Sequence, residues 1–132
     1  MIDHLDHLVL TTTDAARSID FYTRVLGMQL ERFGVSAQLP DGRIAFRFGN
    51  QKINLHVKGG EFNPKAYRPV PGALDLCFIA AITLDEVIAR LAAAGVTIEA
   101  GPGTRTGAIG PIRSVYVRDP DLNLIEISEY LS

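Results

Sequence analysis

The sequence predicts an α+β fold made of two βαβββ modules, whose strands form an eight-stranded concave mixed sheet with the helices outside. Three observations support this prediction. Short runs of residues alternate between apolar and polar side chains, as strands do, and two longer runs repeat their apolar residues with helical spacing. The order strand, helix, strand, strand, strand occurs twice along the chain. Each helical run is followed by a glycine, Gly27 in the first copy and Gly95 in the second, and these lie 68 residues apart.

The composition excludes several classes of protein. Of the 132 residues, 47% are hydrophobic and 21% are charged, which is typical of a single globular domain over residues 1–132. Thirteen basic and fifteen acidic residues are interspersed and leave a net charge of −2, so nucleic acid is not expected as a partner. No apolar run reaches the roughly eighteen residues of a membrane span, so no membrane partner is expected either. The single cysteine, Cys77, excludes an internal disulfide and is typical of a cytoplasmic protein.

The first module, residues 1–57, begins with a predicted strand over residues 5–11. Asp14 then has the side chain of a helix N-cap, and the apolar residues after it share one helical face as far as Gly27, which suits a left-handed helix end. Three further strands are predicted over residues 28–33, 44–48 and 52–57. The pair Asp41-Gly42 lies between the first two of these strands and predicts a hairpin turn.

The second module, residues 73–132, repeats this order after a segment interpreted as a linker, residues 58–72, which holds three glycines and three prolines. Thr83 and Glu86 form a predicted capping box for a helix that ends at Gly95. Strands are predicted over residues 74–79, 96–100, 114–118 and 124–128. Residues 101–111, between the second and third of these strands, contain four glycines and predict a loop that closes over a site.

Four ionisable residues interrupt the apolar pattern of the first and last strands of the modules: His7, His56, Asp75 and Glu126. Alternation places them on the face opposite the apolar residues that pack under the helices. The repeat superposes His7 on Asp75 and, with an offset of 70 residues, His56 on Glu126, so a pseudo-twofold axis would bring all four together. Two imidazoles and two carboxylates suit a divalent cation such as Zn, Ni, Fe, Mn or Co. Each residue taken alone is more simply a hydrogen-bonded histidine or half of a salt bridge.

Three further residues are candidates for binding a substrate. In the glycine-rich segment, Arg105 and Thr106 could hold an anionic group, although a plain connection with a solvated arginine explains them as well. Cys77 shares the phase of Asp75 and could line the same site. A small apolar filler is its simpler role, because no base is paired with it in the sequence.

Several segments resemble the vicinal oxygen chelate superfamily, which contains glyoxalase I, extradiol dioxygenases and fosfomycin- and bleomycin-resistance proteins. The resemblance covers essentially the whole chain, and its carriers are LDHLVLTTTD at 5–14, FYTRVLGM at 21–28, PGALDLCF at 71–78 and RDPDLNLIEI at 118–127. The segments at 54–66 and 101–112 further resemble the subgroup called glyoxalase-domain-containing protein 5. The family fold, named for glyoxalase, bleomycin resistance protein and dihydroxybiphenyl dioxygenase, consists of paired βαβββ modules.

The resemblance also implies roles for the four ionisable residues. His7 and Glu126 match the first-strand and last-strand metal ligands, and Glu126 matches a residue that also accepts a proton in glyoxalase-like members. His56 matches the fourth-strand ligand, where glyoxalase I has a carboxylate. Asp75 stands where most metal-binding members have histidine, so it either binds the metal or orients His7 or His56 through a hydrogen bond.

Two functions therefore remain as hypotheses. The first is a metal-dependent enzyme of the lyase, isomerase or dioxygenase type, acting on a small substrate with two adjacent oxygens. The alternative is a metal-free protein that binds a drug or another small molecule. In either case Leu5 and Val9 would leave apolar surface exposed, so a homodimer is expected, with metal sites at or near its interface.

Overall fold

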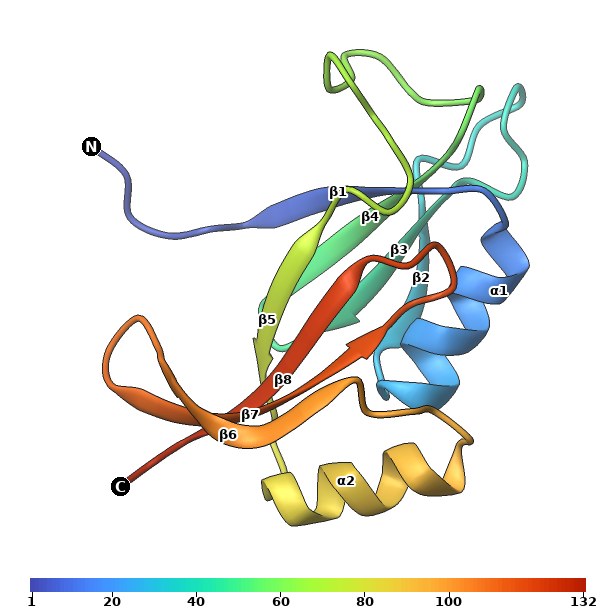
Figure 1. Cartoon of the computed structure of the whole chain (residues 1–132). Coiled ribbons are helices and arrows are strands. Elements are labelled where there is room, and N and C mark those ends of the chain that lie inside the picture. Colours follow the sequence, from blue (N-terminus) through green and yellow to red (C-terminus); the bar gives the residue numbers. More distant parts are fainter. The chain divides into compact units, whose positions relative to one another are not determined.

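The computed structural model describes all residues from Met1 to Ser132 and confirms the α+β fold with two βαβββ repeats (Figure 1). The chain divides into two compact units, Met1–Gly72 and Ala73–Ser132. Hydrogen bonds join the eight strands into two four-stranded mixed sheets, one in each unit. None of the helices is long and apolar enough to cross a membrane.

The sheet of the first unit has the spatial order β1-β4-β3-β2. Its strands are β1 (His7–Thr12), β2 (Gln29–Phe33), β3 (Arg43–Phe48) and β4 (Gln51–Val57). β1 runs parallel to β4, whereas the other neighbours are antiparallel. The predicted Asp41-Gly42 turn joins β2 to β3, and Gly42 has a φ of 71°, at a point where any Cβ would lie 2.6 Å from the Phe33 carbonyl oxygen.

The predicted helix of the first unit is present and has two parts. α1 (Ala15–Asp20) begins at Asp14, whose side chain accepts a hydrogen bond from the Arg17 N–H at 3.1 Å. It continues as a π-helical turn, η1 (Phe21–Val25), and the chain then turns at Gly27 with a φ of 77°. The buried Tyr22 ring stacks on Phe46 of β3 with centroids 5.1 Å apart, so the helix covers the apolar face of the sheet.

The second unit repeats this arrangement with the order β5-β8-β7-β6. Its elements are β5 (Asp75–Ile79), α2 (Leu84–Ala93), β6 (Ala100–Thr106), β7 (Pro111–Arg118) and β8 (Leu124–Tyr130). The Thr83 hydroxyl accepts a hydrogen bond from the Glu86 N–H at 3.2 Å, as the predicted cap requires. α2 packs on β7 and β8 through its buried residues Leu84, Val87 and Leu91 (Figure 1).

Two predictions about the second unit are wrong: the strand over residues 96–100 and the loop over 101–111. β6 starts at Ala100 and pairs with β7, and only the hydrogen bond from the Gly107 N–H to the Gly110 carbonyl closes the turn. β6 is an edge strand, and its register with β7 shifts between Ala100 and Gly103, where Pro102 lies. Proline has no N–H to donate to a ladder, and an irregular edge strand tolerates such a residue. The segment is therefore a hairpin and not an irregular loop.

A buried turn between β7 and β8 fixes the start of β8. The Asp119 carboxylate accepts hydrogen bonds from the backbone N–H of Asp121 and of Asn123 and from the Asn123 amide. The side-chain oxygen Oδ1 of Asn123 in turn accepts a hydrogen bond from the Leu74 N–H at 2.9 Å. Both side chains are almost fully buried, and Leu122 between them has a φ of 70°. This network therefore ties the beginning of β5 to the beginning of β8.

We expect the Asn123→Ala variant to be destabilised by about 1–3 kcal/mol, because it removes the amide that donates to Asp119 and leaves the Leu74 N–H without its side-chain acceptor. Urea denaturation followed by circular dichroism measures this change. Gln38→Ala is the control, since Gln38 is exposed, and it should change the free energy of unfolding by less than about 0.5 kcal/mol. Equal stability of the two variants would contradict the assigned role of the turn.

Candidate functional site

One face of the first unit's sheet carries most of its polar side chains. Residues that pair across a ladder point to the same side, so the pairings of β1, β4, β3 and β2 arrange this face in three rows. The first row is Thr11, His56, Arg43 and Phe33; the second is Val9, Asn54, Ala45 and Glu31; the third is His7, Lys52, Arg47 and Gln29. His7 and His56 therefore share a face, as alternation predicts.

His7 lies at the start of β1 with one ring nitrogen already bonded. Its Nδ1 is 2.7 Å from a carboxylate oxygen of Asp6, and this hydrogen bond lowers the pKa of Asp6. A carboxylate on Nδ1 leaves Nε2 as the ligand atom, which is the arrangement that orients many metal-binding histidines. On the paired strand, Asn54 lies two positions beyond Lys52, the ladder partner of His7, and on the same face. Asn54 is 6% exposed, and its Oδ1 is buried without a hydrogen-bond partner.

His56 lies four positions along β4 from the partner of His7, roughly 13 Å away, and it has a different set of neighbours. Its Nε2 is 3.2 Å from Nη2 of Arg43, and its ring packs edge-on against Phe62. Burial lowers the pKa of His56, and the charge of Arg43 lowers it further, against an opposing effect of Glu61. His56 is therefore a neutral imidazole whose Nε2 accepts a hydrogen bond from a cation.

The pairing of β1 with β4 and of β5 with β8 shows which residues of the two repeats are equivalent, and this differs from the prediction. His7 pairs with Lys52, and Asp75 pairs with Leu124, so a match of His7 to Asp75 places Asn54 on Glu126. The helix caps Asp14 and Thr83 are 69 residues apart and support this match. The predicted match of His56 to Glu126 is wrong because the second unit has four more residues between its first and last strands. Sequence analysis missed Asn54, although Ile53-Asn54-Leu55 has the same pattern as Ile125-Glu126-Ile127.

The corresponding face of the second unit is acidic at its centre. Asp75 and Glu126 are diagonal neighbours on β5 and β8, and Cys77 pairs directly with Glu126. Asp75 is exposed, and its carboxylate forms no ion pair. Glu126 is half-buried, and its Oε2 accepts a hydrogen bond of 2.6 Å from the Ser114 hydroxyl. Ser114 is also 2.6 Å from the buried Ser128 hydroxyl, so a fixed pair of serines orients the Glu126 carboxylate.

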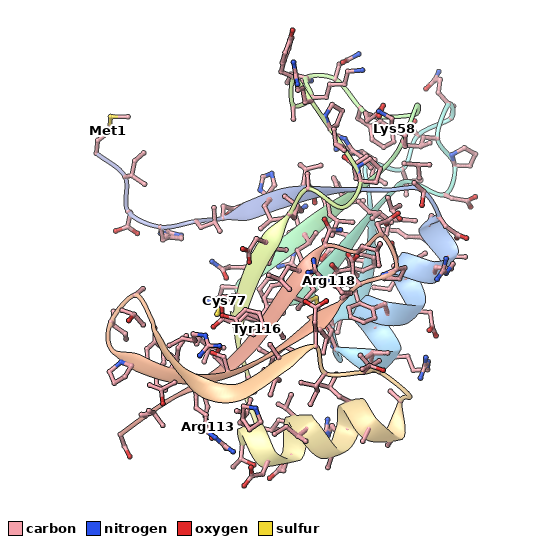
Figure 2. All side chains as sticks on the ribbon, in the orientation of Figure 1. Met1, Lys58, Cys77, Arg113, Tyr116 and Arg118 are labelled. Atoms are coloured by element: carbon pink, nitrogen blue, oxygen red, sulfur yellow. The ribbon has the colours of Figure 1, made fainter.

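Tyr116 and Cys77 are the ladder partners of Glu126 on this face, and Figure 2 shows the two labelled side chains near each other. Burial raises the pKa of the Tyr116 hydroxyl, Arg105 opposes this shift, and the Glu126 carboxylate adds to it. Desolvation also raises the pKa of the Cys77 thiol, a hydrogen bond with Ser128 opposes the shift, and the charge of Glu126 adds to it. Both groups therefore stay protonated at neutral pH, so Cys77 does not have the properties of a nucleophile.

Arg105 and Thr106 do not share a face. The Arg105 guanidinium carbon is 5.5 Å from the centroid of the Tyr116 ring, so this side chain lies with Glu126. Thr106 follows it on β6 and points to the other side, together with Arg113. Arg113 binds Asp85 at the start of α2, away from Cys77 and Tyr116 (Figure 2).

The donor atoms thus occur as two pairs, one in each unit. The first unit offers Nε2 of His7 and Oδ1 of Asn54, and the second offers the carboxylates of Asp75 and Glu126. No group of three or more histidine, cysteine, aspartate or glutamate side chains lies close enough in the structure to hold a metal ion. Each pair presents imidazole nitrogen or oxygen donors, which are the ligand types of divalent transition metals.

A family model described as "Glyoxalase/Bleomycin resistance protein/Dioxygenase superfamily" matches residues 4–127. Virulence protein STM3117 of Salmonella typhimurium is 50% identical over 131 residues, which are 99% of this chain and 87% of that protein. Its crystal structure superposes with a TM-score of 0.93 over 99% of each chain. Glyoxalase domain-containing protein RDO1 of Mycosarcoma maydis is 53% identical over 126 residues, which are 96% of this chain and 68% of that protein.

More distant structures share the fold alone. Lactoylglutathione lyase from Agrobacterium tumefaciens is 24% identical with a TM-score of 0.72, over 98% of this chain and 95% of that one. TnmS3, an antibiotic binding protein from Streptomyces sp. CB03234, is 21% identical with a TM-score of 0.73, over 98% of each chain. The same architecture therefore occurs in a protein named as an enzyme and in one named as a binding protein.

The low pKa of His56 predicts how stability depends on pH. As the pH falls below 6.5, the unfolded chain takes up a proton at this residue that the folded chain resists, so the folded state loses stability. We expect His56→Gln to lose less free energy of unfolding than the wild type between about pH 7.5 and 5.5, measured by urea denaturation in EDTA. His4→Gln, which removes an exposed histidine, should follow the wild type. Three parallel pH profiles would contradict a neutral, buried His56.

Proposed function

This chain belongs to the Glyoxalase/Bleomycin resistance protein/Dioxygenase superfamily, and on that premise we propose that it is a metal-dependent enzyme acting on a small substrate with two adjacent oxygens. The observation that carries the proposal is the unpaired, buried Oδ1 of Asn54, which holds the position in the first unit that Glu126 holds in the second and lies on the same face as His7. A buried polar atom without a partner is costly, and a bound cation is one way to offset that cost.

The proposed ligands are His7, Asn54, Asp75 and Glu126. His56, the fourth-strand ligand suggested by the family resemblance, fits less well because its Nε2 already faces the Arg43 cation. One imidazole and three oxygen donors favour Mn or Fe over Zn, Ni and Co, since oxygen ligands suit the harder ions. A divalent ion held there would bind both substrate oxygens and stabilise the negative charge that develops on them.

The chain's own residues supply the remaining chemistry. Ser114 orients the Glu126 carboxylate through Oε2, and this carboxylate would bind metal or take a proton from the substrate. Arg105, whose guanidinium carbon is 5.5 Å from the centroid of the Tyr116 ring, would bind an anionic group of the substrate. Cys77, protonated at neutral pH, contributes a small surface against which the substrate packs. Thr106, on the other side of β6, has no part in this proposal.

The metal-free alternative rests on the fold of TnmS3, and a fold shared at 21% identity does not decide function. The donor set favours the enzyme, because a binding protein would need hydrogen-bond partners for His7 and Asn54 rather than unused donor atoms. The reaction type follows from the metal, since iron suits O2 chemistry and the other ions suit lyase or isomerase chemistry. A cytoplasmic location and membership of the glyoxalase-domain-containing protein 5 subgroup stay predictions.

Homodimer formation is part of the proposal. Leu5 and Val9 near the start of the chain are 59% and 41% exposed, and Ile79 on β5 is 50% exposed. β1 and β5 are the edge strands of their sheets, so these apolar residues lie along edges that a second copy could cover. A twofold symmetric dimer would contain two equivalent metal sites.

We expect the protein purified from metal-replete medium to contain a divalent ion and to gain thermal stability when Mn or Fe(II) is added after EDTA treatment. Glu126→Ala and His7→Ala should weaken metal binding by about tenfold or more. Asp75→Ala should weaken it less, since Asp75 is exposed and no neighbouring side chain orients its carboxylate by a hydrogen bond. Elemental analysis and thermal titration measure these effects.

Glu129→Ala is the matched control, because Glu129 lies on the same strand as Glu126 and faces the other side. Absence of metal from every preparation, with no stabilisation by Mn, Fe, Co, Ni or Zn, would contradict the enzyme and favour the metal-free binding protein. Loss of binding in His56→Ala but not in Asn54→Leu would assign the fourth-strand ligand to His56.

Mixing the His7→Ala and Glu126→Ala variants tests the dimer and the sharing of its sites. If each site takes first-unit ligands from one chain and second-unit ligands from the other, half of the dimers after exchange are mixed, and each of these has one intact site. About a quarter of the wild-type metal capacity should then return. No recovery after proven subunit exchange would place each site within one chain, and a monomer in light scattering would contradict the dimer.

A further inference from the structure

We propose that Arg43 and Lys52, with the rings of Phe33 and Phe62, form a recognition site for a small organic carboxylate on the polar face of the first unit. Resting on the proposed function, this inference names the class of its substrate: a carboxylic acid with a flat, apolar body. The site involves the first row of this face and Lys52, which is the ladder partner of His7, and it uses neither of the proposed metal-binding atoms of His7 and Asn54.

Neither cation forms an ion pair with a carboxylate, and Lys52 acts on Asp6 and Glu31 only through its charge. Arg47, next to Lys52 on this face, forms an ion pair with Glu31, and Arg24, Arg113 and Arg118 are paired as well. None of the ion pairs in the structure includes Arg43 or Lys52. Glu61 lies near His56, but its two oxygens accept hydrogen bonds from the Gly59 N–H. An anion is therefore the missing complement of this cluster.

Aromatic rings hold the Arg43 guanidinium in place. Its central carbon is 4.4 Å from the centroid of the Phe62 ring and 5.1 Å from that of Phe33. The Lys52 ammonium is 3.8 Å from the same Phe33 centroid, so Phe33 contacts both cations. A planar guanidinium fixed between rings loses little freedom when it binds, and its donors match the two oxygens of a carboxylate.

The hydrogen bonds of Arg43 are incomplete. Its Nη2 donates to His56 at 3.2 Å, whereas Nε is buried and has no partner. The neutral imidazole of His56 accepts a hydrogen bond but brings no negative charge. A partly buried cation that is bonded only to a neutral group costs free energy, and a bound carboxylate would offset that cost.

The surroundings favour a carboxylate with a flat body over a phosphate. The cluster offers one guanidinium and one ammonium beside two phenyl rings, and a dianion would lose more hydration there than a monoanion. A flat, unsaturated group next to the carboxylate can pack against Phe62 or Phe33. Phe62 belongs to residues 58–72, so the segment interpreted as a linker contributes directly to the site.

Calorimetric titration with benzoate tests the site, with benzamide as the uncharged analogue of the same shape and inorganic phosphate as a bare anion. We expect benzoate to bind the protein as purified, and to bind equally well after EDTA dialysis, with benzamide and phosphate at least about tenfold weaker. Retention of binding without metal separates this site from the proposed metal centre, so the two proposals can fail independently.

Three variants locate the bound anion. Arg43→Gln should weaken benzoate binding by about tenfold or more, and Lys52→Gln, which leaves the Arg43–His56 contact in place, should weaken it measurably. Arg32→Gln removes the same charge from the opposite face of β2 and should have no effect. The proposal is overturned if benzoate does not bind, if benzamide or phosphate binds equally well, or if Arg32→Gln weakens binding as much as Lys52→Gln.

Discussion

The parallel pairing of the first and last strand in each unit is the constraint on which the candidate sites depend. In a ladder the register decides which side chains become neighbours, and a shift of two residues keeps the face but changes every neighbour. The pairs His7–Lys52 and Asp75–Leu124 place Asn54 beside His7 and Glu126 beside Asp75. The covered face, where Tyr22 stacks on Phe46 in the first unit, holds that register because a slip of one residue would expose the core.

Much of the fold could be predicted from the sequence because its signals are local. Asp14 and Thr83 cap helices as expected, and the strands with alternating apolar residues are all present, apart from one. The exception is the predicted strand over residues 96–100, in place of which the chain forms β6, whose sequence AGPGTRT has the composition of a turn. Its pairing comes from β7, and an edge strand with a register shift tolerates Gly101, Pro102 and Gly103. Local composition could not reveal this, since the stabilising partner lies later in the chain.

The candidate site was predicted less completely, and for a related reason. Alternation correctly places His7, His56, Asp75 and Glu126 on polar faces, because the face of a residue depends only on its own strand. The neighbours of a residue depend on register across strands, and this is set by connections of unequal length in the two units. The contact between His56 and Arg43 follows from the antiparallel pairing of β3 and β4, for which the sequence of β4 alone gives no signal.

The corrected register also explains how a repeated scaffold gives two different faces. Arg43 and His56 of the first unit correspond to Ser114 and Ser128 of the second, and in both units the two partners are in contact, at 3.2 Å and 2.6 Å. The serine pair is small and neutral, so it supports the adjacent Glu126 carboxylate. The larger arginine–histidine pair presents a cation between aromatic rings. Substitutions at equivalent ladder positions thus gave one sheet acidic donors and the other a site for anions, while the covered faces kept the apolar residues that both units need to fold.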